Sequence, residues 1–326
     1  MALLDVDDLH VSFSTDDGIV QAVRGVSFQV HRGKTLGIVG ESGSGKSVAT
    51  QTVTGLTRGA SVSGSAIFDG LDLLTATEPE LRRIRGARIG MIFQDPLTSL
   101  HPLYRVGWQI TELIRAHQAG TSRRTARARA AELLDLVGIP TAADRIDDYP
   151  YQFSGGMRQR VMIAMALICK PALLIADEPT TALDVTIQAQ ILDLMQELQK
   201  KRSGASILLI THDLAVIAET CNRVIVMYGG KIQEVATVID LFDNPKHPYT
   251  LGLLGSIPHL QDKGSPLDAI PGIVPSIFEY PPGCRFQSRC VHAMDRCRTE
   301  EPALHTIAPG HQVRCHLMED EAKEAR

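Results

Sequence analysis

Residues 40–47 read GESGSGKS, which is the pattern G-x-x-x-x-G-K-[ST] of a phosphate-binding loop. The apolar run at 35–39 predicts a buried strand before this loop, and the small and apolar residues at 47–53 predict a helix after it. In such a strand–loop–helix unit, the glycines leave backbone N–H groups free to hold phosphate oxygens at the positive end of the helix. The sequence therefore predicts an α/β protein that binds a nucleotide.

Two side chains of the loop have expected roles of their own. Lys46 supplies a mobile cation for the β- and γ-phosphates, and Ser47 offers a hydroxyl ligand to Mg²⁺. The loop residues expected to contact the nucleotide are Gly40, Ser42, Gly43, Ser44, Gly45, Lys46 and Ser47.

Composition narrows the class of protein. A chain of 326 residues with 44% hydrophobic and 21% charged residues fits a globular protein of one large or two smaller domains. The net charge of −4 gives no support for a nucleic-acid partner. We see no export signal at the N-terminus, and the longest apolar stretch, 161–176, is interrupted by Lys170 and Pro171 and is too short to span a bilayer. Any membrane role is therefore expected to come through a partner.

A second motif complements the loop. The apolar run at 173–176 predicts a central parallel strand, so Asp177 and Glu178 emerge at its carboxyl end, where open α/β sheets bind ligands. There Asp177 can hold Mg²⁺, and Glu178 can orient and deprotonate an attacking water.

Two further polar residues follow predicted core strands. Gln94 ends the strand predicted at 88–94 and is a candidate to sense Mg²⁺ and the γ-phosphate, and His212 follows the strand predicted at 206–210. Taken alone, a glutamine at such a position is usually just solvated, and a histidine more often caps a helix or packs in the core.

The pattern along the chain suggests three segments. Residues 1–96 and 169–235 carry the strand patterns of an ATP-binding core, whereas 97–168 show amphipathic helical patterns typical of an inserted subdomain. Residues 236–326 are rich in proline and are expected to form a mostly irregular appended module.

The inserted segment contains a second predicted anion site. Ser154 is a helix N-cap candidate, and Gly155 and Gly156 leave backbone amides open at the positive end of that helix. One nucleotide hardly needs two such sites in one chain. The second site is therefore expected to serve a nucleotide held by another subunit.

These motifs, in this order, resemble those of ATP-binding-cassette (ABC) ATPases. The resemblance is closer still to the ATP-binding subunits of the bacterial dipeptide/oligopeptide permease family, in particular the first of the two paired ATPase subunits of dipeptide permeases. It rests on MIFQDPLTSL at 91–100, ADEPTTALDVTIQAQ at 176–190, HPYT at 247–250 and PGIVP at 271–275. The resemblance implies a P-loop fold with an inserted helical subdomain.

The resemblance also implies roles for single residues. Two chains dock head to tail, so that Ser154, Gly155 and Gly156 of one close over ATP held by the other, with Asp184 at the seam. Phe13 matches the aromatic residue that stacks on adenine, although tyrosine is commoner there, and Phe153 stands where leucine is usual.

The implied function is an ATP-hydrolysing motor of a di- or oligopeptide importer, peripheral on the cytoplasmic face of the membrane. Its implied partners are a paralogous ATPase subunit, two transmembrane permease subunits and, through them, an extracellular or periplasmic peptide-binding protein. Residues 95–108 match the surface that receives coupling helices, although apolar residues there could instead pack the helical subdomain. The alternatives are the same motor with another cargo, such as nickel or glutathione, or an ABC ATPase without a transport role.

Four cysteines near the C-terminus, Cys284, Cys290, Cys297 and Cys315, form a C-x5-C-x6-C-x17-C pattern. It lacks the tight C-x2-C spacing of most zinc sites, and four thiolates in a loop-rich segment suit an iron–sulfur cluster. Members of the resembled family carry a [4Fe–4S] cluster in this region. A Zn²⁺ site, free thiols and disulfides are the alternatives, with the nearby histidines as possible ligands. Because these cysteines lie far in sequence from every nucleotide motif, we expect a structural role.

Overall fold

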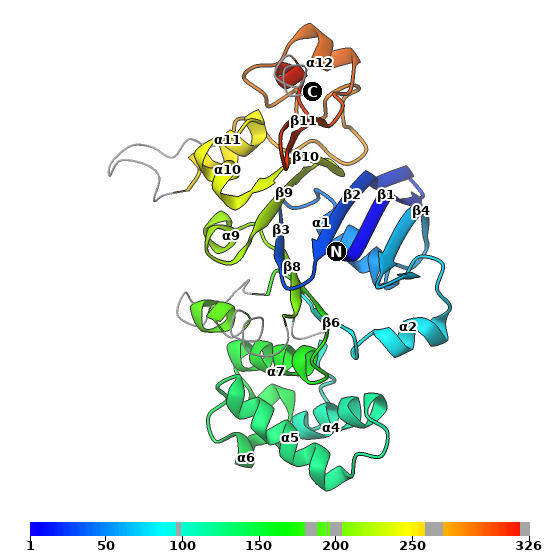
Figure 1. Ribbon diagram of the computed structural model, residues 1–326, viewed down its shortest axis with the longest axis vertical. Coiled ribbons are helices and arrows are strands. Elements are labelled where there is room, and N and C mark those ends of the chain that lie inside the picture. The colour runs from blue at the N-terminus through cyan, green and yellow to red at the C-terminus, as the bar shows by residue number, and fades with distance from the viewer. Residues whose placement is uncertain (96–98, 180–187, 194, 196–203, 258–269, 320–326) are drawn as a thin grey trace. The chain divides into compact units, whose positions relative to one another are not determined.

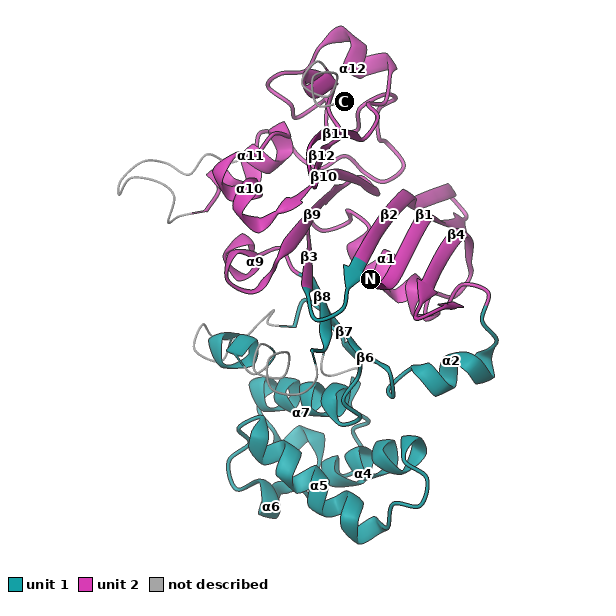
Figure 2. Cartoon of the chain, in the orientation of Figure 1, with its two compact units in different colours: residues 1, 30–34, 76–210 teal, residues 2–29, 35–75, 211–326 magenta. Residues whose placement is uncertain are grey.

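The computed structural model describes residues 1–95, 99–179, 188–193, 195, 204–257 and 270–319. The chain forms two compact units (Figure 2). The first contains Met1, 30–34 and 76–210, and the second contains 2–29, 35–75 and 211–326. The division into three segments expected from the sequence stays a prediction.

The second unit contains an antiparallel sheet with the order β2-β1-β4-β5, of which Figure 1 labels β2, β1 and β4. Its strands are β1 (Ala2–Thr15), β2 (Gly18–His31), β4 (Ala60–Phe68) and β5 (Leu71–Asp72). Along the second half of β2 the side chains alternate between buried and exposed, as expected for a sheet with one face against the core.

Five more strands of this unit follow the order β11-β12-β10-β9-β3. They are β3 (Thr35–Val39), β9 (Arg223–Tyr228), β10 (Lys231–Thr237), β11 (His305–Ala308) and β12 (His311–Val313). Strands β3 and β9 pair in parallel, with Ile38 opposite Ile225, whereas β10 is antiparallel to both β9 and β12. Every residue of β3 is buried, as the apolar run predicts.

Helices flank these strands. They are α1 (Lys46–Val53), α9 (Leu214–Thr220), α10 (Val238–Asp243), α11 (Pro248–Gly255) and α12 (Asp295–Thr299), with a short 3-10 helix at His316–Met318. The region after 236 is thus more regular than the sequence predicts. Pro248 starts α11 because proline lacks only an N–H that the first helical turn leaves unpaired, and Thr237 caps α10 by accepting from the Asp240 N–H.

The first unit contains three parallel strands in the order β8-β7-β6. They are β6 (Ile89–Ile92), β7 (Leu173–Asp177) and β8 (Ser206–Ile210), and both β7 and β8 are buried throughout. Helix α2 (Glu78–Ile84) precedes them and begins with a capping box in which Thr77 and Glu80 bond each other's backbone N–H groups. These strands match the three that the sequence predicts near 88–94, 172–177 and 206–210.

This unit also contains the helices α4 (Val106–His117), α5 (Arg123–Leu136), α6 (Ala142–Arg145) and α7 (Gly155–Leu167), with a 3-10 turn at Pro150–Gln152. They share one apolar core, to which Ile110, Ile114, Leu134 and Phe153 contribute. Residues 188–193 of this unit are also helical. No helix among the described residues is long and apolar enough to cross a membrane.

Candidate functional site

The phosphate loop connects β3 to α1 in the second unit. Gly40, Gly43 and Gly45 all have positive φ, and Gly45 is the N-cap of α1. Two of them also lie too close to neighbouring backbone for any side chain. A Cβ on Gly40 would be 2.2 Å from the Met227 carbonyl oxygen, and one on Gly45 would be 2.4 Å from the Ala22 carbonyl oxygen. The loop conformation therefore requires glycine at both positions.

Lys46 is the first residue of α1 and is 5% exposed. Its ammonium Nζ donates to the Gly40 carbonyl at 2.6 Å, to the Glu41 carbonyl at 3.0 Å and to Ser44 Oγ at 3.4 Å. The loop thus wraps around this cation, while Ser42 and Gly43 are exposed and Ser47 is half-buried. Because the first turn of α1 contains no acidic residue, the helix N-terminus and the ammonium together form an electropositive site suited to phosphate.

The first unit brings together an acidic residue and an amide at the ends of two parallel strands. Strand β7 ends at Asp177, which is 2% exposed, and Glu178 follows it with φ of 47°. Gln94 follows β6, and its Nε2 donates to Glu178 Oε2 at 3.0 Å. The Glu178 N–H donates to the Ile210 carbonyl at 2.9 Å, which fixes the backbone of this unusual conformation. The arrangement can hold a carboxylate in place as a proton acceptor.

Ser154 caps α7 as the sequence predicts. Its Oγ accepts from the Met157 N–H at 3.3 Å, and its side chain is exposed. Gly155 is exposed as well, with no atom within 4 Å of the position that a Cβ would occupy. The first turn of α7 is therefore open to a ligand, whereas Phe153 before it is 2% exposed and packs in the helical core.

The structure also places the remaining predicted site residues. His212 is exposed in the second unit, and Phe13 is half-buried on β1 opposite Ala60 of β4. Gly156 is half-buried in the first turn of α7. Asp184 lies outside the described residues.

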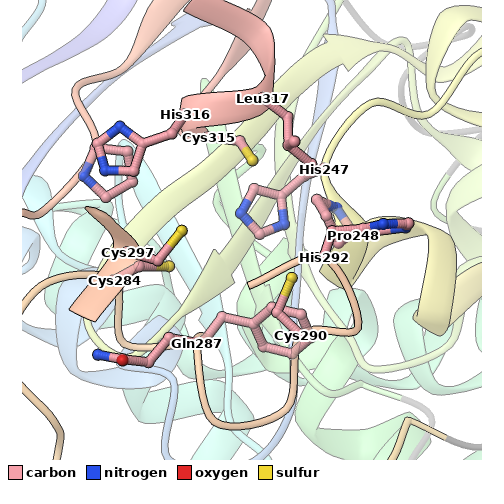
Figure 3. Close-up of a pocket in the computed structure, with 12 residues that line it drawn as sticks. His247, Pro248, Cys284, Gln287, Cys290, His292, Cys297, Cys315, His316 and Leu317 are labelled. Carbon is pink, nitrogen blue, oxygen red and sulfur yellow. The ribbon is translucent and has the colours of Figure 1, made fainter. Parts of the chain in front are cut away.

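The four C-terminal cysteines line one small cavity, together with His247 and His316 (Figure 3). Their sulfur atoms face the same space, although their positions span the chain from Cys284 to Cys315. Burial raises the pKa of Cys284 and of Cys315 to about 11. Across the described ranges, however, no three histidine, cysteine, aspartate or glutamate side chains form a group that could hold a metal ion.

The backbone around this cavity is tightly held. The Cys284 N–H donates to the Cys297 carbonyl at 2.8 Å, and Gly283 has φ of 73°. A Cβ on Gly283 would be 2.4 Å from the Cys297 carbonyl oxygen, so only glycine permits the two cysteine segments to approach this closely.

Sequence reasoning missed two residues next to the phosphate loop. Arg289 pairs with Glu41 through both carboxylate oxygens, and the Tyr249 hydroxyl accepts from the Glu41 N–H. Glu41 stands at an unspecified position of the loop pattern, and Arg289 belongs to no motif. A single sequence therefore gives no pattern from which the contact between Arg289 and Glu41 could be predicted.

Comparison with known proteins supports this description. The family described as "ABC transporter" matches residues 23–181, and "Oligopeptide/dipeptide transporter, C-terminal region" matches 233–297. The dipeptide transport ATP-binding protein DppD of Escherichia coli is 51% identical over 324 residues, covering 99% of this chain and 98% of that protein. The oligopeptide transport ATP-binding protein OppD of Bacillus subtilis is also 51% identical, covering 98% of this chain and 90% of its own length.

A solved structure of a dimeric ATP-binding cassette in a post-hydrolysis state, bound to ADP and Pi, aligns with a TM-score of 0.66 and 27% identity. It covers 72% of this chain and 98% of its own. The fold is therefore that of an ABC-type P-loop ATPase. Within that class, the chain belongs to the family of dipeptide and oligopeptide transport ATP-binding proteins.

The geometry predicts that one substitution lowers turnover and that another lowers ATP affinity. Glu178→Gln keeps the size of the side chain but removes the proton acceptor, so ATP binding should persist while turnover falls by roughly 10²–10⁴-fold. Lys46→Ala removes the cation around which the loop wraps, so ATP affinity itself should fall. Equilibrium binding of labelled ATP and steady-state phosphate release measure the two effects separately.

The exposed Glu219 of α9 gives a matched control, since Glu219→Gln makes the same chemical change away from these groups. Near-normal turnover in Glu178→Gln would contradict its role. Unchanged affinity in Lys46→Ala would contradict the role of the loop.

Proposed function

We propose that this protein is the ATP-hydrolysing subunit of an importer for dipeptides or oligopeptides. The observation that carries the proposal is the match along both parts of the chain, to the ABC transporter family at 23–181 and to the oligopeptide/dipeptide transporter region at 233–297. Relatives at about 51% identity support the proposal, since they are named as dipeptide and oligopeptide transport ATP-binding proteins. Nickel or glutathione as cargo, and an ABC ATPase without a transport role, remain the alternatives.

The residues divide the chemistry of hydrolysis between them. Lys46 and the amides of the loop hold the β- and γ-phosphates, while Ser47, Asp177 and Gln94 are the candidate ligands of Mg²⁺ or of its water shell. When bound, Mg²⁺ neutralises charge that develops on the phosphate oxygens. Glu178 takes the proton of the attacking water, Gln94 orients this carboxylate, and His212 is a candidate to contact the γ-phosphate.

We infer that the complete site needs two chains. The exposed start of α7 at Ser154, with open space around Gly155, fits a surface that closes over a nucleotide held by another subunit. Asp184 is assigned to the same seam, and Phe13 to adenine stacking. The second chain is proposed to be a paralogous ATPase, and the pair acts on the cytoplasmic face of the membrane beneath two permease subunits that receive peptide from an extracellular or periplasmic binding protein.

Reconstitution tests this function directly. The purified subunit should hydrolyse ATP slowly, because it lacks the partner surface, and should gain activity when assembled with its permease and partner ATPase. Proteoliposomes containing that complex and the binding protein should accumulate labelled dipeptide on addition of ATP. Full activity from a strictly monomeric preparation would contradict the two-chain site. Uptake of nickel or glutathione without peptide uptake would contradict the cargo.

Within residues 99–108, Leu100 and Tyr104 differ in how far their side chains are exposed to solvent. Leu100 is 3% exposed and packs in the helical core, whereas Tyr104 is 46% exposed and stacks on Trp108 with ring centroids 4.3 Å apart. We propose the exposed Tyr104–Trp108 pair as part of the surface that receives the coupling helices. Leu97, another residue of the 95–108 stretch expected to receive the coupling helices, lies outside the described residues.

Substitutions of Tyr104 and Leu100 are expected to affect transport and stability differently. Tyr104→Ala should leave ATP binding and melting temperature near those of the wild type but reduce transport, because it alters an exposed surface. Leu100→Ala should instead lower stability by about 2–5 kcal/mol, as buried leucine truncations do. Tyr151→Ala is the control, since Tyr151 is 67% exposed and stacks on Tyr149 in the same unit. Normal transport by Tyr104→Ala in a folded complex would contradict the coupling surface.

We also propose that Cys284, Cys290, Cys297 and Cys315 hold one [4Fe–4S] cluster, with Zn²⁺ as the alternative. The donor set fits, because four cysteine sulfurs from separate turns face one cavity. A cluster is wider than a single ion, so its thiolates do not need to converge on one point. Iron would also keep the buried thiols deprotonated, which their raised pKa values otherwise disfavour. The cluster would cross-link a segment that contains little regular structure.

Anaerobic purification tests the cluster. The protein should be brown with broad visible absorbance, and should contain iron and sulfide, whereas Cys290→Ser should lose this colour. Cys169→Ser should keep it, because Cys169 packs against the helical core of the first unit. Stoichiometric zinc without iron or sulfide in protein kept anaerobic would overturn the cluster in favour of a zinc site.

A further inference from the structure

We propose that Arg289 and Tyr249 are positioning residues for nucleotide binding, which act on the phosphate loop through Glu41. The proposal rests on the assignment of residues 40–47 as the nucleotide-binding loop. It adds that the C-terminal region, which contains both residues, holds this loop in its binding conformation.

Arg289 provides the first of two anchors. Its side chain is 4% exposed, and its guanidinium donates from Nη1 to Glu41 Oε2 at 2.6 Å and from Nη2 to Glu41 Oε1 at 3.0 Å. Its Nε donates to the Pro271 carbonyl at 3.1 Å. A bidentate pair fixes orientation as well as distance, so the Glu41 side chain has one favoured position. The hydrogen bonds that Arg289 donates to the Glu41 carboxylate hold the pKa of Arg289 above its usual range.

Tyr249 provides the second anchor. It is fully buried near the start of α11, and its hydroxyl oxygen accepts from the Glu41 N–H at 2.8 Å. Its ring packs against Tyr228 and Phe286, with centroid distances of 4.8 and 5.3 Å. The hydroxyl is therefore presented from a rigid aromatic cluster. It holds the backbone of Glu41 while Arg289 holds the side chain.

The backbone carbonyl of Glu41 is hydrogen-bonded to Lys46, the cation expected to bind phosphate. The Glu41 carbonyl accepts from Lys46 Nζ at 3.0 Å, so all three polar groups of Glu41 are bonded. The carboxylate and the N–H face the C-terminal region, and the carbonyl faces Lys46. Any shift of Glu41 therefore moves a group that helps to place the ammonium.

Arg289 also has an electrostatic role. The Glu41 side chain is 29% exposed and carries a negative charge within a loop assigned to bind phosphates. The guanidinium compensates this charge. Without it, an unpaired carboxylate would repel the incoming triphosphate and the loop backbone would loosen, so both effects would weaken ATP binding.

The experiment measures the dissociation constant of MgATP for the full-length chain. Arg289→Met keeps the apolar stem but removes the charge, and should raise the dissociation constant about tenfold, within the range of coupled contacts. Adding Glu41→Gln should recover part of this loss, because the unpaired carboxylate is then gone. A residue that only stabilised the fold would show no such rescue. Arg289→Lys should lie between the wild type and Arg289→Met.

Arg296→Met is the matched control, since Arg296 lies in the same region and pairs with the exposed Glu300 and with Glu319. Tyr249→Phe removes only the hydroxyl and should weaken binding about threefold to fivefold, as expected for one hydrogen bond. If Arg289→Met does not fold, the ATP affinity of Tyr249→Phe tests the proposal in its place.

Affinities within about twofold of the wild type for folded Arg289→Met, or no recovery in the double variant, would overturn the proposal, because coupled residues must show non-additive effects. Unchanged affinity in Tyr249→Phe would overturn it as well. Lys46→Ala separates this failure from that of the loop itself, since normal ATP binding by Lys46→Ala would refute the nucleotide role of residues 40–47.

Discussion

The structure depends on the close approach of the phosphate loop to the backbone beneath it. Gly40 lies against the Met227 carbonyl of β9, Gly45 lies against the Ala22 carbonyl of β2, and the Gly230 N–H donates to the Ser44 carbonyl at 3.1 Å. These contacts fix the path of the loop backbone. A loop held by such contacts can direct its amides at phosphate with a smaller ordering cost on binding.

Glu41 extends this constraint into the C-terminal region. Its side chain, N–H and carbonyl are all hydrogen-bonded, and two of its partners, Arg289 and Tyr249, belong to segments far along the chain. Arg289 immediately precedes Cys290, which lines the four-cysteine cavity. The segment that pairs with the phosphate loop therefore continues directly into the wall of the cavity. These contacts offer a physical route by which the C-terminal region could influence nucleotide binding.

Much of the fold was predictable because it rests on local patterns. The apolar runs predict β3, β7 and β8, and they single out Gln94 and Glu178 as polar residues that follow core strands. The structure adds that these two side chains contact each other, as the ends of neighbouring parallel strands permit. Helices α10 and α11 were not predicted, because the prolines of this region suggested irregular structure, whereas Pro248 occupies the first turn of a helix.

The contact between Arg289 and Glu41 could not be predicted from the sequence either. The two residues are 248 positions apart, and neither stands at a position that a motif specifies. Their pairing follows only from the tertiary packing of Tyr228, Tyr249 and Phe286, which brings the Arg289 segment to the loop. The cysteines, by contrast, were predicted to gather from their number and residue type, although their distance in sequence from the nucleotide motifs concealed how near Arg289 lies to the loop.

Amide hydrogen exchange across residues 40–47 tests most directly whether the C-terminal region holds the phosphate loop. The measurement compares the wild type, Arg289→Met and the control Arg296→Met in the absence of nucleotide, because protection of an amide reports how readily its segment opens. The account predicts faster exchange across 40–47 in Arg289→Met alone, with β3 and β9 unchanged. Equal protection of this loop in all three proteins would contradict it.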